Sequence, residues 1–106
     1  MPKFIIGYLG NPPQPSTPEE GQVHMGKWKE WMDGLGDAVV MPPSPLKNNK
    51  IVTTTGVSDD TRNDGLTGFI LVEAADIDAA LAMAAADPYL DMAGGTLQVS
   101  EIMQMG

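Results

Sequence analysis

The sequence contains no cysteine, no long hydrophobic run and few basic residues. The lack of cysteine excludes disulfide bonds, zinc–thiolate sites and a cysteine nucleophile. Because no run of about 18 apolar residues occurs, we expect no transmembrane helix. Only 6 basic residues, scattered along the chain, stand against 14 acidic ones, and the net charge is −8. An acidic surface repels nucleic-acid phosphates and anionic lipids, so we expect neither nucleic-acid nor membrane partners.

The length and composition of the chain fit one small globular domain. The 106 residues are 42% hydrophobic, which is enough for a modest core. There is no internal repeat and no linker-like segment, so we expect a single domain over residues 1–106. The N-terminal apolar run KFIIGYL is too short for the core of a signal peptide. A cytoplasmic location is therefore the expectation.

Short β-rich apolar runs and helix-capping residues predict five strands and two helices. Thr17, Pro18 and Glu20 have the spacing of an N-cap, a first helical position and a capping box. Asp76 is placed to cap the second helix. The predicted strands cover residues 3–9, 37–41, 50–57, 66–74 and 96–103, the predicted helices cover 17–33 and 77–86, and the predicted loops include 43–50 and 58–65.

With the strand at 50–57 set aside, the predicted order is βαββαβ. This order predicts an α+β, ferredoxin-like fold with an extra hairpin strand, in which both helices cover one face of an antiparallel sheet. The strands at 3–9 and 68–72 are apolar on both faces, however, and two helices cover only one. A second copy of the chain is the simplest cover for the other face, so we expect a homodimer.

The only histidine, His24, lies in the stretch VHMGKWKEWM and is followed at helical spacing by Trp28 and Trp31. An imidazole exchanges protons near neutral pH and therefore serves well as a general acid or base. A partly buried histidine with a purely structural role fits the same pattern. Trp28 is open to two interpretations as well, as the wall of a pocket for an apolar ligand or as a core or dimer contact.

Three stretches of the sequence resemble one known family. The runs TGFILVEAADIDAALAMA, DPYL and GGTLQVSEIM are similar to the YCII-related (YciI-like, DGPF-type) domain family of the dimeric α+β barrel superfamily. The resemblance implies a ferredoxin-like protomer, a homodimer with packed sheets and a cleft between helix and sheet. It also implies a catalytic His–Asp pair, which falls on His24 and on Asp87 of the D-P-aromatic motif.

Taken alone, the residues of that motif also have plainer interpretations. Asp87 and Pro88 together end a helix, because the residue before a proline is pushed out of the helical region. Tyr89 is suited to bind a substrate through its hydroxyl, but it equally suits a core position with a wet hydroxyl.

Two functional hypotheses follow. In the first, the chain is a small cofactor-free enzyme of the lyase, isomerase or hydrolase type, in which His24 moves a proton and Asp87 orients it. Trp28 and Tyr89 would then bind the substrate. In the alternative, the chain is a non-catalytic small-molecule-binding or accessory dimeric module, and His24 is structural. No metal site is expected, since one histidine and scattered carboxylates lack the spacing of a ligand set.

Overall fold

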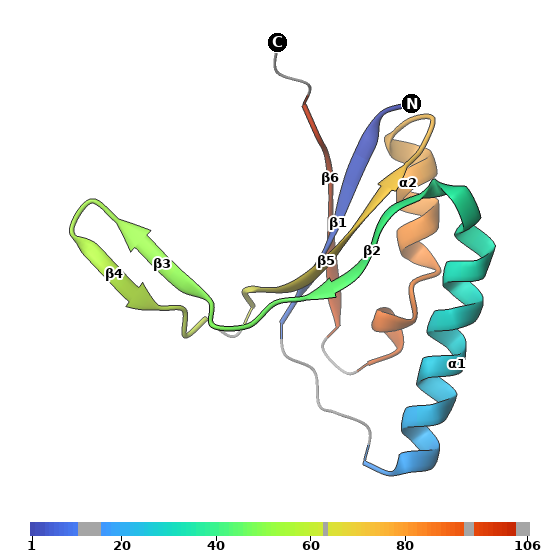
Figure 1. Ribbon diagram of the computed structural model, residues 1–106, viewed down its shortest axis with the longest axis horizontal. Helices are drawn as coiled ribbons and strands as arrows, with labels where there is room; N and C mark the ends of the chain where they lie inside the picture. The colour runs from blue at the N-terminus through green and yellow to red at the C-terminus, as the bar shows by residue number, and fades with distance from the viewer. Residues whose placement is uncertain (11–15, 63, 93–94, 104–106) are drawn as a thin grey trace.

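Along the chain, a strand and a helix are followed by four strands, a second helix and a last strand, which is one strand more than the sequence predicts (Figure 1). The computed structural model describes residues 1–10, 16–62, 64–92 and 95–103. The elements are β1 (Lys3–Leu9), α1 (Pro18–Leu35), the 3-10 helix η1 (Gly36–Ala38), β2 (Val39–Pro45), β3 (Lys50–Thr53), β4 (Gly56–Asp59), β5 (Leu66–Glu73), α2 (Ile77–Ala85), the 3-10 helix η2 (Pro88–Asp91) and β6 (Thr96–Glu101).

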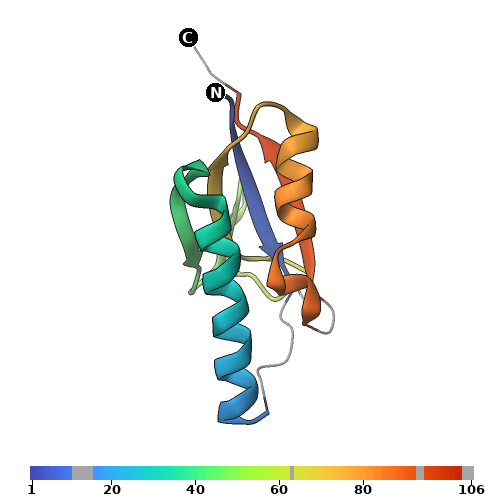
Figure 2. The ribbon, with the colours of Figure 1, turned by 90° about the vertical axis from the view of Figure 1, so that its right-hand side faces the viewer.

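Four of these strands form an antiparallel sheet in the order β2–β5–β1–β6. Figure 2 shows α1 and α2 side by side in front of the sheet, so both helices cover the same face. The order of strands and the single helical layer confirm the α+β, ferredoxin-like prediction.

The helix-covered face of the sheet carries the core of the molecule. Phe4 lies opposite Val72 and Ile6 lies opposite Ile70, and all four side chains are fully buried. Tyr8 continues the same row and is 5% exposed. Successive side chains of a strand point to opposite faces, so this row follows directly from the alternation in the sequence.

The opposite face of the sheet is apolar over its central strands, carries the polar Gln98 and Ser100 on β6, and has no covering layer among the described residues. Ile5 lies opposite Leu71, which is flanked on β2 by Met41. Phe69 lies opposite Gly7, and the side chain of Leu66 occupies the space that a side chain at Gly7 would need. We call this surface the open face, and it is formed by Ile5, Met41, Leu66, Phe69 and Leu71.

Helix α1 begins and ends at the residues that local chemistry favours. The hydroxyl of Thr17 accepts a hydrogen bond from the Glu20 amide at 3.1 Å, as the capping pattern predicts. The Glu20 carboxylate, however, accepts hydrogen bonds from the amide and the hydroxyl of Ser16. In a capping box it would accept from the amide of Thr17, one residue later. Gly36 has a φ of 56°, which favours glycine, and its amide binds the carbonyl of Met32.

Several predicted boundaries were wrong. The strand predicted from residue 37 begins at Val39, because Asp37 and Ala38 belong to η1, and the first helix continues to Leu35. The two larger errors lie near prolines or threonines. Strand β2 continues through Pro42, Pro43 and Pro45, where a loop was predicted. Prolines are tolerated there because β2 lies at the edge of the sheet, where a missing amide leaves no partner unsatisfied. The stretch 50–57 is not one strand, because it turns at residues 54–55 and continues as β4, so that part of the predicted loop 58–65 is strand.

The β3–β4 hairpin stands away from the rest of the molecule. We call residues 46–62 the arm. Figures 1 and 2 together show that the arm projects from the side of the sheet opposite the helices. The Cα radius of gyration is 15.2 Å, whereas a compact chain of this length has about 13 Å. The arm is therefore a true projection and not part of the packed body.

Candidate ligand cavity

A cavity of about 910 Å³ lies between the first half of α1 and one end of the sheet. This volume is within the range typical of small-molecule sites. The wall is mostly apolar and draws on five elements. Its main side chains are His24, Met25 and Trp28 from α1, Tyr8 from β1, Pro43 and Pro45 from β2, Thr67 from β5, and Tyr89 and Met92 from the η2 region.

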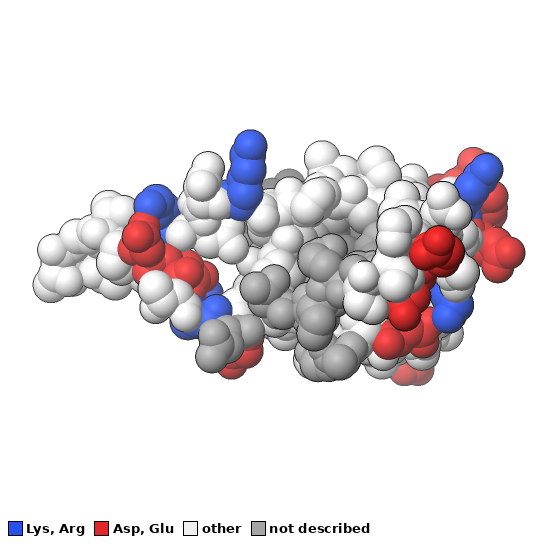
Figure 3. Space-filling model, turned by 90° about the horizontal axis from the view of Figure 1, so that it is seen from below, with Lys and Arg blue, Asp and Glu red and all other residues white. Residues whose placement is uncertain are grey.

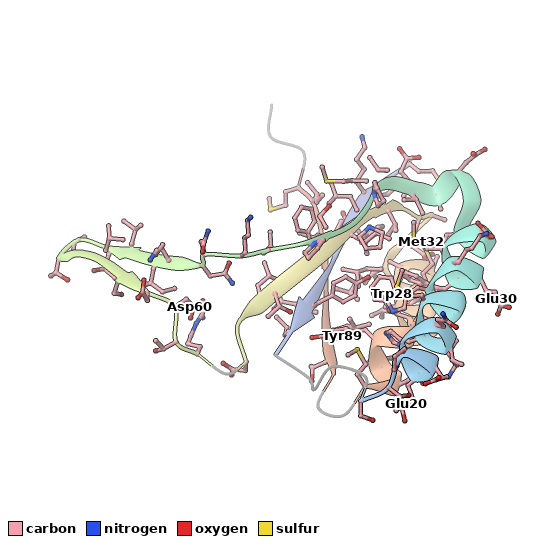
Figure 4. The ribbon with its side chains drawn as sticks, turned by 60° about the horizontal axis from the view of Figure 1, so that its bottom comes forward. Glu20, Trp28, Glu30, Met32, Asp60 and Tyr89 are labelled. Carbon is pink, nitrogen blue, oxygen red and sulfur yellow. The ribbon has the colours of Figure 1, made fainter. Side chains whose placement is uncertain are left out.

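A continuous row of aromatic rings forms the floor of this cavity, which we call the aromatic cavity. The ring of Tyr8 lies 5.5 Å from that of Trp28 and 4.9 Å from that of Tyr89, both in tilted arrangements. These separations are those of favourable aromatic pairs. In Figure 4, Trp28 and Met32 point from α1 toward the sheet, while Glu20 and Glu30 point outward.

His24 lies in the cavity wall and is held by its neighbour one turn along the helix. The indole N–H of Trp28 donates to Nε2 of His24 at 2.8 Å. An imidazole nitrogen that accepts a hydrogen bond carries no proton, so the proton of the neutral ring is on Nδ1. Protonation at Nε2 would break the bond from Trp28. The side chain is thus arranged as a neutral hydrogen-bond donor.

Asp87 is buried behind the aromatic row and does not line the cavity. Its side chain is 2% exposed, and Oδ1 accepts the Tyr89 amide at 2.9 Å, which caps η2. Oδ2 has no hydrogen-bond partner among the described residues. Burial raises the pKa of this carboxyl, although the Tyr89 amide, the Tyr8 side chain and, whenever the imidazole is protonated, the positive charge of His24 oppose the increase.

Tyr8 links the cavity to this buried carboxyl. Its ring lines the cavity, while its hydroxyl is buried and, within the described part of the chain, also lacks a hydrogen-bond partner. Burial and the adjacent charge of Asp87 raise the pKa of Tyr8 above its usual range. The phenol therefore remains protonated and lies beside a carboxyl that has one oxygen unpaired.

The structure brings three of the four predicted site residues to the cavity and leaves one behind it. His24, Trp28 and Tyr89 line the cavity, whereas Asp87 does not. The described residues show no hydrogen bond or ion pair between His24 and Asp87, and only a protonated imidazole would act on the carboxyl, through its charge. The hydroxyl of Tyr89 is already engaged, because it donates to the carbonyl of Leu9 at 2.9 Å.

Sequence reasoning treated Tyr8 only as part of the apolar strand at residues 3–9 and missed its position at the cavity. The available signal was its place as the last inward residue of β1, two residues before Gly10 and close to the prolines that follow. A polar phenol at the end of an otherwise aliphatic row marks the point where the core meets a cavity. The prolines of β2 were missed because they were assigned to a loop.

Replacement of Asp87 by asparagine tests the buried carboxyl. Because its native pKa is raised, native Asp87 retains a proton over a pH range, starting near 4, in which the unfolded chain has lost it. Wild-type stability should therefore fall as pH rises through this range, whereas Asp87→Asn cannot titrate. We expect the unfolding free energy of Asp87→Asn to increase relative to wild type from pH 4 upward, as measured by urea denaturation.

The matched control is Asp91→Asn, which removes an exposed carboxyl from the same 3-10 helix. Asp91 forms an exposed ion pair with Lys27 at 3.3 Å. Loss of such a pair should change the unfolding free energy by no more than about 1 kcal/mol, with little dependence on pH. A constant or decreasing difference between Asp87→Asn and wild type would contradict the raised pKa.

Comparison with known proteins identifies the family of the chain. Among the described residues, no helix is long and apolar enough to cross a membrane, and no three His, Asp or Glu side chains gather as a metal site. No curated protein matches the sequence. The family model of the YCII-related domain matches residues 11–106, which is most of the chain. The chain belongs to the YCII-related domain family, as the resemblance of its strands and its D-P-aromatic motif predicts.

Proposed function

We propose that this chain binds a small, neutral, largely aromatic molecule in the aromatic cavity. The observation that carries the proposal is the row formed by Tyr8, Trp28 and Tyr89 along a mostly apolar cavity of about 910 Å³. Aromatic and apolar walls with few polar groups are typical of small-molecule sites. A flat ring inserted over this row would extend the stacking that is already present.

The polar groups of the wall favour a neutral ligand that carries a hydrogen-bond acceptor. The Nδ1–H of His24 is the donor that remains once Nε2 has accepted the Trp28 indole. The buried Asp87 lies directly behind Tyr8, and the whole chain carries a net charge of −8. An anionic ligand would therefore be repelled, and a neutral alcohol or ketone would be preferred.

Binding of 2-naphthol, with 2-naphthoate as its charged counterpart, tests this proposal. We expect 2-naphthol to bind at least tenfold more tightly, as measured by calorimetry at pH 7. In ¹H–¹⁵N spectra, the indole signal of Trp28 should shift on binding. The indole signal of Trp31 should change little, because its N–H is bound to the Met83 carbonyl away from the cavity.

The variant Trp28→Ala removes the central ring, and we expect it to weaken 2-naphthol binding at least tenfold. Val23→Ala, on the outward side of the same helix, is the control and should bind as wild type does, since Val23 is 61% exposed. Absence of saturable binding, or equal shifts of both indole signals, would refute the proposal.

A second candidate function is cofactor-free proton transfer by His24. The observation in its favour is that a positive charge on His24 would lower the pKa of Asp87, so a proton gained by the imidazole is stabilised by the buried carboxylate. The imidazole would take a proton from carbon at Nε2 and release the Trp28 indole, while Asp87 would balance the charge through space. The need to break the bond at 2.8 Å makes binding without chemistry the first candidate.

Deuterium exchange of 2-tetralone distinguishes the two candidates, because the ketone matches naphthol in size and has an acidic C1–H. General-base catalysis predicts that wild type exchanges this hydrogen for solvent deuterium at least tenfold faster than His24→Gln. Glutamine keeps hydrogen-bonding capacity but cannot take up the proton. Equal rates, with binding retained in both proteins, would leave binding alone as the function.

We also propose that the chain forms a homodimer through the open face. Ile5, Phe69 and Leu71 are only half-buried there, and an apolar sheet face without cover favours association. The strands alternate cleanly, so the helices cannot cover both faces. A second copy of the same surface is self-complementary in a twofold arrangement.

Light scattering of wild type and Phe69→Glu tests the dimer. We expect a wild-type mass of twice 11.2 kDa at micromolar concentration and a single 11.2 kDa chain for the variant, because a buried unpaired carboxylate opposes association. Val23→Glu, which adds the same charge on the outer side of α1, should remain dimeric. A monomeric wild type would refute the homodimer.

A further inference from the structure

We propose that the arm clasps the body of a second copy of this chain, with Val52 and Val57 as its contact residues. The inference rests on the proposed homodimer and adds a second contact surface to it. The two valines lie opposite each other on neighbouring strands, so they share one side of the arm. They are 74% and 68% exposed, which is unusual for a cross-strand pair of apolar residues.

The direction of the arm suits this role. The arm projects from the side of the sheet that carries the open face and points away from the helices (Figures 1 and 2). A second sheet packed on the open face would lie about 10 Å away, on that same side. The arm would therefore run alongside the second copy, and by twofold symmetry the second arm would run alongside the first copy.

The length of the arm is sufficient for the contact. Val52 is seven residues beyond Pro45, where β2 ends, and extended chain covers about 3.3 Å per residue. The valine pair therefore reaches up to about 23 Å from the end of the sheet. The chain bends at Asn48, which has a φ of 58°, so this figure is an upper limit. It is more than twice the spacing of about 10 Å between two packed sheets, so the length allows the pair to reach the flank of the partner.

The hairpin needs such a support. A two-stranded hairpin alone is marginally stable in water. Two hydrogen bonds hold the root of the arm to β5, from the Leu46 amide to the Thr67 carbonyl and from the Asn49 side chain to the Leu66 carbonyl. A third, from the Asp60 amide to the Asn49 carbonyl, joins the two sides of the arm at its root. Beyond this root, the extensive contacts of β3 and β4 are with each other. Burial of the valines against a second copy would stabilise the outer half.

The charge of the arm also fits a second copy and not a basic partner. The arm holds three of the six basic residues but only two of the fourteen acidic ones, so its net charge is +1 and that of the remainder is −9. Within it, Lys50 pairs with Asp59 and Arg62 pairs with Asp60. Figure 3 shows an uncharged arm end and acidic side chains gathered on the side of the helices. The arm can thus approach an acidic body without repulsion.

Sedimentation over a dilution series tests the clasp with charge-matched double variants. V52D/V57D adds two charges on the valine side of the arm, and T53D/S58D adds two on the other side. We expect V52D/V57D to raise the dimer dissociation constant at least tenfold and T53D/S58D to raise it less than threefold. All four sites lie outside the core, so circular dichroism should be unchanged.

Hydrogen exchange supplies a second measurement that does not depend on the arm variants. The amides of β3 and β4 should exchange at least tenfold more slowly in the wild-type dimer than in monomeric Phe69→Glu. Equal weakening by both double variants, or an intact dimer in V52D/V57D while Phe69→Glu dissociates, would overturn the clasp and leave the proposed dimer in place. A monomeric wild type would overturn both.

Discussion

The hydrogen bond from the Trp31 indole to the Met83 carbonyl, 3.0 Å long, fixes how the two helices sit on the sheet. It joins α1 to α2 across the core, where the Trp31 ring is 8% exposed. Because α1 is a rigid cylinder, this one anchor also sets the position of the turn before it. Trp28 is thereby brought over Tyr8, and His24 is carried to the rim of the cavity.

The cavity exists because α1 extends beyond the end of the sheet that it covers. Its last turns, with Trp31 and Leu35, pack on the core, whereas its first turns extend past the end of β1 (Figure 2). The space below those first turns is lined by aromatic edges and prolines and is not filled by a close-packed layer. At Gly68 a side chain would come within 3.1 Å of the Ser44 carbonyl, so β2 approaches β5 closely and closes this side of the cavity.

Two buried polar side-chain atoms lie next to the core without the hydrogen bonds that such atoms usually make. Buried polar atoms are normally paired, yet the Tyr8 hydroxyl and Asp87 Oδ2 lack partners in the described ranges of the chain. Asp87 is nevertheless needed locally, since its other oxygen caps η2 and so positions Tyr89. Tyr89 in turn ties η2 to the end of β1 through the Leu9 carbonyl. Asp87 thus stabilises the start of η2 through one oxygen, while burial of its unpaired oxygen lowers the stability of the fold.

The sequence by itself determined where most helices and strands form and which of their side chains point toward the core. Alternation placed Phe4 and Ile6 inward, the caps at Thr17 and Asp76 set both helix starts, and a spacing of four put His24 beside Trp28. Each of these depends on residues within one turn or one strand pleat of each other. The strand limits at β2 were not determined, because whether a proline is tolerated depends on whether the strand lies at an edge.

Only the tertiary structure decided which distant groups meet. The contact of Tyr89 with the Leu9 carbonyl spans 80 residues, and the closeness of Tyr8 to Asp87 spans a similar length of chain. Such contacts depend on strand order, register and helix placement together, and no short pattern encodes them. For the same reason, the His24–Asp87 pair was predicted only because the family resemblance implies it, and Tyr8, which lines the cavity together with His24 and lies beside Asp87, could be found only in the folded chain.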